Sequence, residues 1–277
     1  MMQSIADIEE AKAIMRRGLG KAELEFIASL TAPFAWVIRL PDHNYAAKNG
    51  SAFFLDTGSR LFGVTAAHVV SKWRSDLAKQ KVVASFIGGR GTTLPIDPSR
   101  FIDIDDKIDI ATFAITERQV ASIGHTVLTG YQKAWPPGPP QVDRGLYYCG
   151  FPGNGRIWLS ANEISFGAVP GSGVATSVSE VDISSLIERE HLMPALGHGI
   201  PPENFDFGGI SGGPMLTVIE TTIRSWALAG VIYQGPNPST DEQEAIAGLE
   251  IIKARRAHFI LPDGTLNRAL WHALNPR

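Results

Sequence analysis

Short apolar runs rich in β-branched and aromatic residues recur along most of the chain, separated by polar turn residues. Gly, Pro and Asn bound many of the runs, as at Pro41, Asn49-Gly50 and Gly58. Runs of this kind predict strands joined by hairpins. Many short strands with few helices predict an all-β sandwich or a pair of barrels. The runs are 34–40, 51–57, 60–66, 81–87, 108–115, 146–151, 156–164, 167–178, 213–219, 225–234 and 257–262.

Helical spacing is confined to the two ends of the chain. After Ser4, a residue type that caps helices, apolar residues recur at helical intervals, and Gly18 and Gly20 predict the end of this helix near Leu19. Near the other end, residues 267–273 predict a short helix. Its apolar side chains are expected to pack back onto the body of the protein: Leu270, Trp271 and Leu274.

A segment dense in proline and glycine, residues 134–145, interrupts the strand pattern near its middle. Proline cannot donate to a sheet ladder, so this segment cannot be a central strand. We therefore predict that it connects two β halves. The predicted parts are a helical leader (1–29), a first barrel (30–133), the connection (134–145) and a second barrel with the C-terminal helix (146–277).

Composition narrows the class of protein. The chain has 277 residues, 44% of them hydrophobic, with 25 Lys and Arg against 28 Asp and Glu. A pI near 6.2 offers no basic footprint, so no nucleic-acid partner is expected. No apolar run reaches the roughly 18 residues of a membrane span, so no membrane partner is expected either. The acidic N-terminal residues do not resemble a signal peptide, and together with a single cysteine, Cys149, they predict a cytoplasmic protein.

The strongest chemical signal is the segment 205–216, FDFGGISGGPML, in which Ser211 is flanked by pairs of glycines. A nucleophilic serine needs backbone N–H groups aimed at the oxyanion that forms when its hydroxyl attacks a carbonyl. Glycine lets the backbone take the required angles and lets a substrate approach closely. The N–H groups of Gly209 and Ser211 are the expected oxyanion hole.

Such a serine also needs a base and a group that orients the base. His68 lies where a predicted buried strand, LFGVTA, runs into a turn of small residues. A histidine with a pKa near neutrality suits the role of base. Asp109 stands at the head of the apolar run IDIATFAI, where a carboxylate needs a hydrogen-bond partner. Asp106, in the same acidic stretch, is the alternative.

These three segments resemble the motifs of a known enzyme family. TAAHV around His68, DIA around Asp109 and GISGGP around Ser211 are similar, in content and order, to those of trypsin-like serine proteases with the chymotrypsin fold, in particular bacterial members without disulfides. The resemblance covers about residues 30–262. It implies two six-stranded antiparallel barrels with the active site in the cleft between them.

The same resemblance implies residues that contact substrate. ALAGVIYQG, residues 227–235, resembles the strand that pairs with an extended peptide, which assigns that contact to Tyr233, Gln234 and Gly235. By the same resemblance Phe205, Asp206 and Gln234 fall near the pocket for the residue preceding the cut. Ile210 stands where zymogen-activated members have an aspartate, so the usual activation pair is absent.

The sequence therefore predicts a serine endopeptidase that acts through an acyl-enzyme, with no metal and no organic cofactor. Its expected partners are a peptide or protein substrate and a regulatory protein acting on the leader helix or on the 187–205 loop. Two alternatives stay open: a silent module of the same fold that binds peptides or a partner, and an esterase with the same triad. Cys149 is expected to be a small buried hydrophobic residue.

Overall fold

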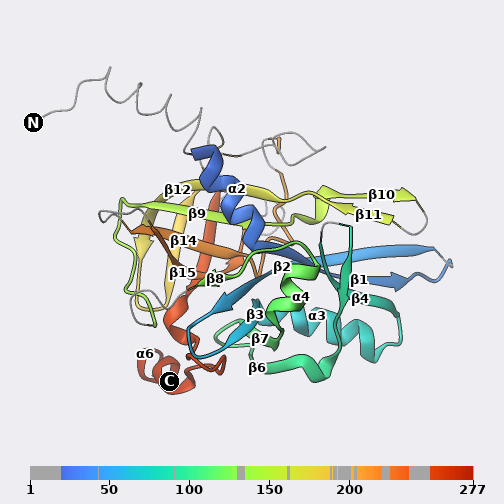
Figure 1. Cartoon of the computed structure of the whole chain (residues 1–277), viewed down its shortest axis with the longest axis horizontal. Helices are drawn as coiled ribbons and strands as arrows, with labels where there is room; N and C mark the ends of the chain where they lie inside the picture. The colour runs from blue at the N-terminus through green and yellow to red at the C-terminus, as the bar shows by residue number, and fades with distance from the viewer. Residues whose placement is uncertain are drawn as a thin grey trace, which may run out of the picture.

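The fold is known from a computed structural model, in which most of the chain is placed (Figure 1). The predicted helix 4–19 and most of the predicted loop 187–205 lie outside the described residues. The predicted boundaries of the leader, the first barrel, the connection and the second barrel remain predictions. The described residues are 20–42, 44–89, 91–129, 135–160, 163–187, 189, 192, 201–202, 205–219, 225–236 and 250–276.

The N-terminal half of the described chain is one strongly curved sheet with two helices. The sheet order is β5-β4-β1-β2-β3-β7-β6, its neighbouring strands are antiparallel, and β8 pairs in parallel with β2. The helices are α3 (Ala67–Ala78) and α4 (Glu117–Ser122). The strands are β1 (Thr31–Arg39), β2 (Tyr45–Asp56), β3 (Leu61–Thr65), β4 (Val82–Gly88), β5 (Thr93–Pro95), β6 (Phe101–Asp105), β7 (Ile110–Ala114) and β8 (Leu128–Thr129).

The C-terminal half is a closed six-stranded barrel in the order β12-β13-β16-β15-β14-β9. A separate hairpin, β10 (Arg156–Ser160) with β11 (Glu163–Phe166), projects from it (Figure 1). The barrel strands are β9 (Gly145–Gly150), β12 (Val169–Val178), β13 (Asp182–Leu186), β14 (Pro214–Ile219), β15 (Ser225–Gln234) and β16 (Ile251–Arg256).

The all-β, two-part architecture expected for the chymotrypsin fold is thus confirmed, with one difference in the first half. That half is an eight-stranded sheet whose described ladders leave β5 and β6 as its two ends, and not a closed six-stranded barrel. Three of its strands, β5, β6 and β8, are too short or too polar to have stood out in the sequence.

Outside the candidate site, three places differ from the sequence prediction. Helix α2 (Gly20–Leu30) begins at the glycine that was expected to end a helix, because Leu24, Ile27 and Leu30 recur at helical spacing and are buried against β9 and β12. Residues 257–262 do not form a strand. The strand is β16 just before them, and residues 257–259 form a short 3₁₀ helix.

The third difference lies at Asn49-Gly50, which the sequence suggested as a turn. Strand β2 runs straight through it for 12 residues. A Cβ on Gly50 would come within 2.5 Å of the Val69 side chain, so glycine here makes room for helix α3. Asn49 Nδ2 donates to the carbonyl of Phe151 at 2.6 Å, which ties β2 to the second half.

Buried apolar residues form three clusters. One lies inside the first sheet and includes Phe34 and Trp73 of α3, and another lies inside the closed barrel and includes Met215. The third is shared by the two halves, where Phe53 of the sheet and Val231 of the barrel belong to the same cluster. A shared apolar cluster of this kind holds the two halves in one relative position.

The C-terminal segment also crosses from the barrel to the first sheet. Helix α6 (Arg268–Leu274) begins after Asn267, whose side chain accepts the N–H of Leu270 at 3.0 Å. The predicted C-terminal helix is therefore present, and its Trp271 ring meets Phe259 edge-on at 5.4 Å between ring centroids. Just before the helix, Thr112 of β7 donates its hydroxyl to the Gly264 carbonyl at 2.5 Å.

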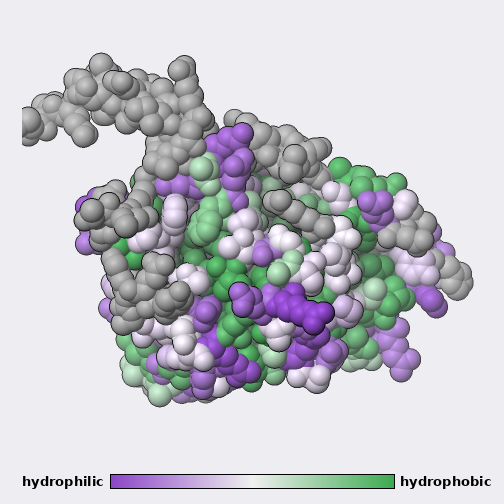
Figure 2. Space-filling model, viewed as in Figure 1, coloured by the Kyte–Doolittle hydropathy of each residue, from purple (hydrophilic) through white to green (hydrophobic). Residues whose placement is uncertain are grey.

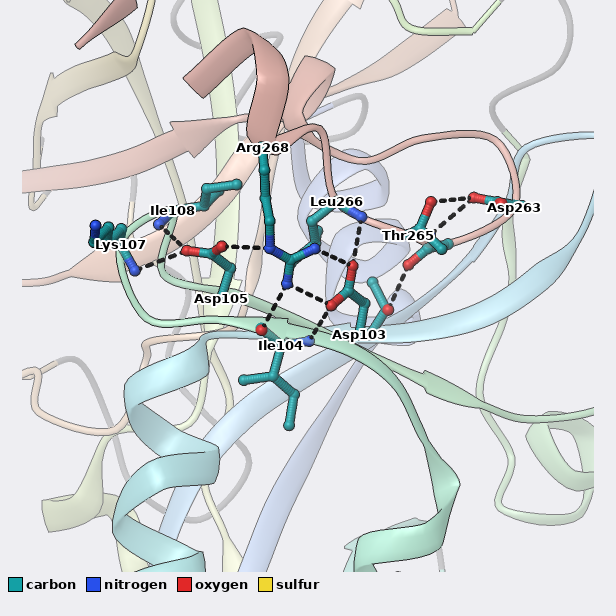
Figure 3. A network of polar contacts seen from close by, with 11 residues as sticks. Asp103, Ile104, Asp105, Lys107, Ile108, Asp263, Thr265, Leu266 and Arg268 are labelled. Carbon is teal, nitrogen blue, oxygen red and sulfur yellow. Dashed lines mark hydrogen bonds and ion pairs between the residues drawn. The ribbon is translucent and has the colours of Figure 1, made fainter. Parts of the chain in front are cut away.

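Arg268 anchors this segment to β6 (Figure 3). Its guanidinium bonds both carboxylate oxygens of Asp103, at 2.6 and 2.7 Å, and its Nε lies 2.8 Å from Asp105. The Asp103 carboxylate also accepts the N–H of Leu266 at 2.9 Å. Paired bonds of this geometry are the strong form of an arginine–carboxylate contact.

We expect Arg268→Met to lower the free energy of unfolding by about 1–2 kcal/mol at pH 7, because water screens a guanidinium whose side chain is 44% exposed. Hydrogen bonds from Arg268 hold the pKa of Asp103 below its usual value. This contribution is therefore present above the unfolded pKa of about 3.9 and is lost as the pH falls through the lower folded-state value. Urea unfolding of both proteins at pH 7 and at a series of pH values below about 4 measures it, and a difference that does not shrink as the pH falls would contradict the ion-pair origin.

The single cysteine is enclosed by the shared cluster. Cys149 is fully buried, and burial raises the pKa of its thiol to about 12. Since the thiolate is the reactive form, we expect maleimide to modify the native protein at least about 100-fold more slowly than the protein in denaturant. Equal rates in the two states would show that the native thiol is accessible.

The surface facing the viewer in Figure 2 mixes charged and apolar residues, with apolar side chains gathered over the β10–β11 hairpin. Ile157, Trp158 and Leu159 of β10 are each more than 40% exposed. Within the described ranges, no helix has the length and apolar character needed to cross a bilayer.

Candidate active site

His68 and Asp109 meet directly. The Nδ1 atom of His68 lies 2.8 Å from one carboxylate oxygen of Asp109 and 3.1 Å from the other. The side chain of Asp109 is 16% exposed and that of His68 is 33% exposed. A mostly buried carboxylate on Nδ1 leaves Nε2 of the ring as the basic nitrogen, because the hydrogen bond fixes the proton on Nδ1.

Local structure explains how the two side chains find each other. His68 lies in the first turn of α3 and not in the turn of small residues that the sequence suggested. Ala66, the N-cap of this helix, has no side-chain cap, and the carboxylate of Asp109 accepts the His68 backbone N–H at 2.9 Å instead. Asp109 therefore binds both the backbone and the ring of His68, and the positive end of the helix favours its negative charge.

The turn that presents Asp109 is unusual. Asp109 has φ of 59°, in the left-handed region that aspartate and asparagine enter more readily than other non-glycine residues. Its N–H donates to the Asp105 carbonyl at 2.8 Å, and Asp105 in turn accepts the N–H groups of Lys107 and Ile108 (Figure 3). The Arg268 contacts described above hold this turn from the outside.

The alternative aspartate has a different partner. Asp106 accepts the hydroxyl of Ser71, one helical turn after His68, at 2.8 Å, in an exposed contact. Of the two candidates considered from the sequence, the structure therefore places Asp109 against the imidazole.

The serine segment docks against the same end of the first sheet. A Cβ on Gly212 would lie 2.0 Å from the Ser51 carbonyl, 2.4 Å from Thr65 Oγ1 and 2.9 Å from the Ala66 nitrogen. Ala66 is two residues before His68. Position 212 needs a glycine for two reasons: its φ of 91° disfavours other residues, and a Cβ would clash with these atoms. The glycine therefore brings Ser211 beside the start of α3.

Ser51, which the sequence analysis missed, connects this segment to the first half. Its N–H donates to the Ser211 carbonyl at 2.8 Å and its hydroxyl donates to the Gly209 carbonyl at 2.9 Å. The hydroxyl also accepts the Phe151 N–H at 2.8 Å. Ser51 is fully buried in β2. The sequence around it predicts an ordinary strand, so nothing local distinguishes this serine from any other strand residue.

The peptides that carry the two expected oxyanion donors are each held by their carbonyl. The Gly208 carbonyl accepts the Gly153 N–H at 2.6 Å, and the Ile210 carbonyl accepts the Gly213 N–H at 3.0 Å. Because a trans peptide points its carbonyl and its N–H in opposite directions, the N–H groups of Gly209 and Ser211 point away from these partners. Among the described residues neither N–H has an acceptor, and Gly209 has φ of 107°.

The hydroxyl of Ser211 is directed at another group. Ser211 is 8% exposed, and its Oγ donates to the Tyr233 carbonyl at 3.1 Å. In the part of the chain that the structure describes, no hydrogen bond joins this hydroxyl to His68. In this conformation the hydroxyl is therefore bound by the end of β15.

The residues expected to bind a peptide backbone lie at the end of β15. Strand β14 pairs with β15 up to the partners Pro214 and Val231, and the Ile232 N–H donates to the Gly213 carbonyl. Tyr233 to Gly235 therefore extend beyond the ladder with β14, on the side where Ser211 lies. The Tyr233 ring stacks on Arg255, with 4.8 Å from the guanidinium carbon to the ring centroid.

The residues expected near the specificity pocket have structural roles. Asp206 accepts the Gly208 N–H at 2.7 Å and so shapes the loop before the serine. Phe205 meets Phe207 edge-on at 5.2 Å. Ile210, where an activation pair would need an aspartate, is buried in the barrel cluster. A Cβ on Gly235 would come within 2.5 Å of Ile210, so these two residues pack directly.

Comparison with known proteins adds the following. No protein-family model matches the chain, and no curated protein matches it. Two similar solved structures concern Sesbania mosaic virus: the serine protease domain of its polyprotein (11% identity, 83% of this chain and 95% of that chain, TM-score 0.40), and a study of coupled folding and binding of its disordered VPg protein (10%, 84% and 95%, TM-score 0.42). At these values the likeness carries nothing about activity.

Proposed function

We propose that this protein is a trypsin-like serine endopeptidase in which Ser211 is the nucleophile, His68 the general base and Asp109 the group that orients the base. The observation that carries the proposal is the double contact of Asp109 with His68, through Nδ1 and through the backbone N–H. The docking of the serine loop beside Ala66 supports it. A histidine held by a buried carboxylate next to a glycine-flanked serine is the arrangement that acyl transfer requires.

In the proposed reaction, the Ser211 hydroxyl gives up its hydrogen bond to the Tyr233 carbonyl. Its Oγ then attacks the substrate carbonyl carbon while His68 Nε2 takes its proton. Asp109 stabilises the imidazolium that forms, and the N–H groups of Gly209 and Ser211 bind the oxyanion. His68 then gives the proton to the leaving amine, and water hydrolyses the acyl-enzyme. No step in this scheme needs a metal or an organic cofactor.

The substrate is proposed to be an extended peptide that adds as a strand to Tyr233, Gln234 and Gly235. The resemblance of residues 227–235 to the strand that pairs with an extended peptide supports this, as does the hydrogen bond that places the Tyr233 carbonyl beside the Ser211 hydroxyl. Phe205 and Asp206 are proposed to border the pocket that receives the side chain before the cut.

A fluorophosphonate probe tests the proposal. The native protein is expected to label, whereas Ser211→Ala and His68→Ala lose labelling by at least about 10³-fold. Peptide hydrolysis measured beside ester hydrolysis then separates a peptidase from an esterase. Labelling that survives in Ser211→Ala would place the reactive residue elsewhere.

One observation favours a second function, a silent module that binds a peptide or partner protein. The Ser211 hydroxyl donates to the Tyr233 carbonyl, and no hydrogen bond of the described residues joins it to His68. If the folded native protein does not label while a peptide library still yields ligands that bind at β15, the silent module is the correct reading.

A further inference from the structure

Arg255 is a buried charge next to the candidate site that the proposed chemistry does not use. It lies on β16 in the second barrel and is 8% exposed. Its NH1 forms an ion pair with Asp182 of β13, the residue opposite it in the ladder. Burying a guanidinium is expensive unless its donors are used, so the remaining contacts of Arg255 need explanation.

The first of these contacts reaches the turn that presents Asp109. The Nε atom of Arg255 donates to the Ile108 carbonyl at 2.7 Å, across the boundary between the two halves. That carbonyl belongs to the peptide that joins Ile108 to Asp109. A charge-assisted bond from the barrel therefore holds the peptide immediately before the residue with φ of 59°.

The second contact reaches the residue that holds the serine. The guanidinium packs against two aromatic rings, with its central carbon 4.8 Å from the centroid of Tyr233 and 4.8 Å from that of Trp271. Tyr233 is the residue whose carbonyl accepts the Ser211 hydroxyl. Arginine suits this position because its flat face stacks on rings while its edge donates hydrogen bonds.

We propose that Arg255 is a positioning residue for the reaction proposed above, setting the Asp109–His68 pair in register with Ser211. It does so by bonding the peptide before Asp109 and stacking on Tyr233. Asp109 and Ser211 belong to different halves of the molecule. Arg255 bonds the peptide before Asp109 and stacks on Tyr233, whose carbonyl binds the Ser211 hydroxyl. The inference rests on the proposed function but makes a claim about geometry that can be measured without turnover.

The chain offers a matched control in the next residue. Arg256 is 6% exposed and pairs with Glu180 at 3.2 Å and with the Ser179 carbonyl at 3.2 Å. None of these partners belongs to the candidate site. Arg255→Met and Arg256→Met each remove a buried guanidinium from β16, so general loss of stability affects both. Only Arg255→Met removes contacts with residues that adjoin Asp109 and Ser211.

Two readouts are measured on the full chain under conditions where urea unfolding shows each variant to be folded. The first is the downfield proton resonance of His68 Nδ1–H, which reports the bond to Asp109. The second is the rate of fluorophosphonate labelling as a function of pH. We expect Arg255→Met to shift or broaden the resonance and to slow labelling by about 10- to 100-fold. Arg256→Met is expected to leave the resonance at its native position and the labelling rate within about 3-fold of the native rate.

Arg255→Lys keeps the charge but lacks the flat fork, and we expect it to stay at least about 10-fold slower than the native protein. If Arg255→Met does not fold, Arg255→Lys takes its place in the comparison with Arg256→Met. Equal resonances and equal labelling rates in the Arg255 and Arg256 variants would overturn the positioning role. A native protein that does not label refutes the proposed function, and in that case the His68 resonance alone decides the role of Arg255.

Discussion

Replacing Asp109 with asparagine is expected to slow fluorophosphonate labelling and peptide hydrolysis by about 10⁴-fold at neutral pH while leaving the fold intact. The Asp109 carboxylate accepts a hydrogen bond from His68 Nδ1 at 2.8 Å. An amide that donates to Nδ1 would hold the imidazole in the opposite tautomer, with its proton on Nε2, where the serine proton must go. The imidazolium would also lose its neighbouring negative charge.

The fold should tolerate this change because asparagine, like aspartate, enters the left-handed conformation that position 109 requires. Its side-chain oxygen can still accept the His68 backbone N–H. The matched control is Asp106→Asn, three residues earlier, where the carboxylate binds Ser71 at the surface. We expect this control to label at the native rate. Equal losses in the two variants would mean that Asp109 does not orient the base.

The second large effect concerns folding. We expect Gly212→Ala to lower the free energy of unfolding by about 4 kcal/mol, measured by urea unfolding. The backbone at position 212 has φ of 91°, which strains an alanine. The added Cβ would also lie 2.0 Å from the Ser51 carbonyl, which is held in a strand and cannot withdraw. The serine loop would be pushed away from the first sheet, and labelling would fall with it.

Two other glycines serve as controls that separate the effect of backbone strain from that of the clash with Ser51. Gly91 has φ of 83° but open space around its Cβ position, so Gly91→Ala measures backbone strain alone, about 1 kcal/mol. Gly145 has neither positive φ nor a neighbour within 4 Å, and Gly145→Ala should be close to neutral. A Gly212→Ala protein no less stable than Gly91→Ala would show that the loop does not pack against Ser51.

The β-rich architecture could be predicted because period-2 and continuous apolar runs are local properties of the sequence. Strands β1, β3, β4, β7, β9, β14 and β15 all fall where such runs predicted them. Helix α3 was missed although its buried residues Val69, Val70 and Trp73 recur at helical spacing, because the segment follows directly on a predicted strand and was interpreted only as a turn of small residues.

The sequence by itself determined the residue types that the proposed chemistry needs and their order: histidine, aspartate and a glycine-flanked serine. It could do so because the glycines that such a serine loop requires are neighbours in the sequence. Only the tertiary structure decided the contacts among them. Asp109 rather than Asp106 meets His68, Ser211 donates to Tyr233, and Ser51 and Arg255 connect the two halves. These contacts join residues up to 158 positions apart in the sequence, and such pairings are set by the packing of two β halves on a shared apolar cluster.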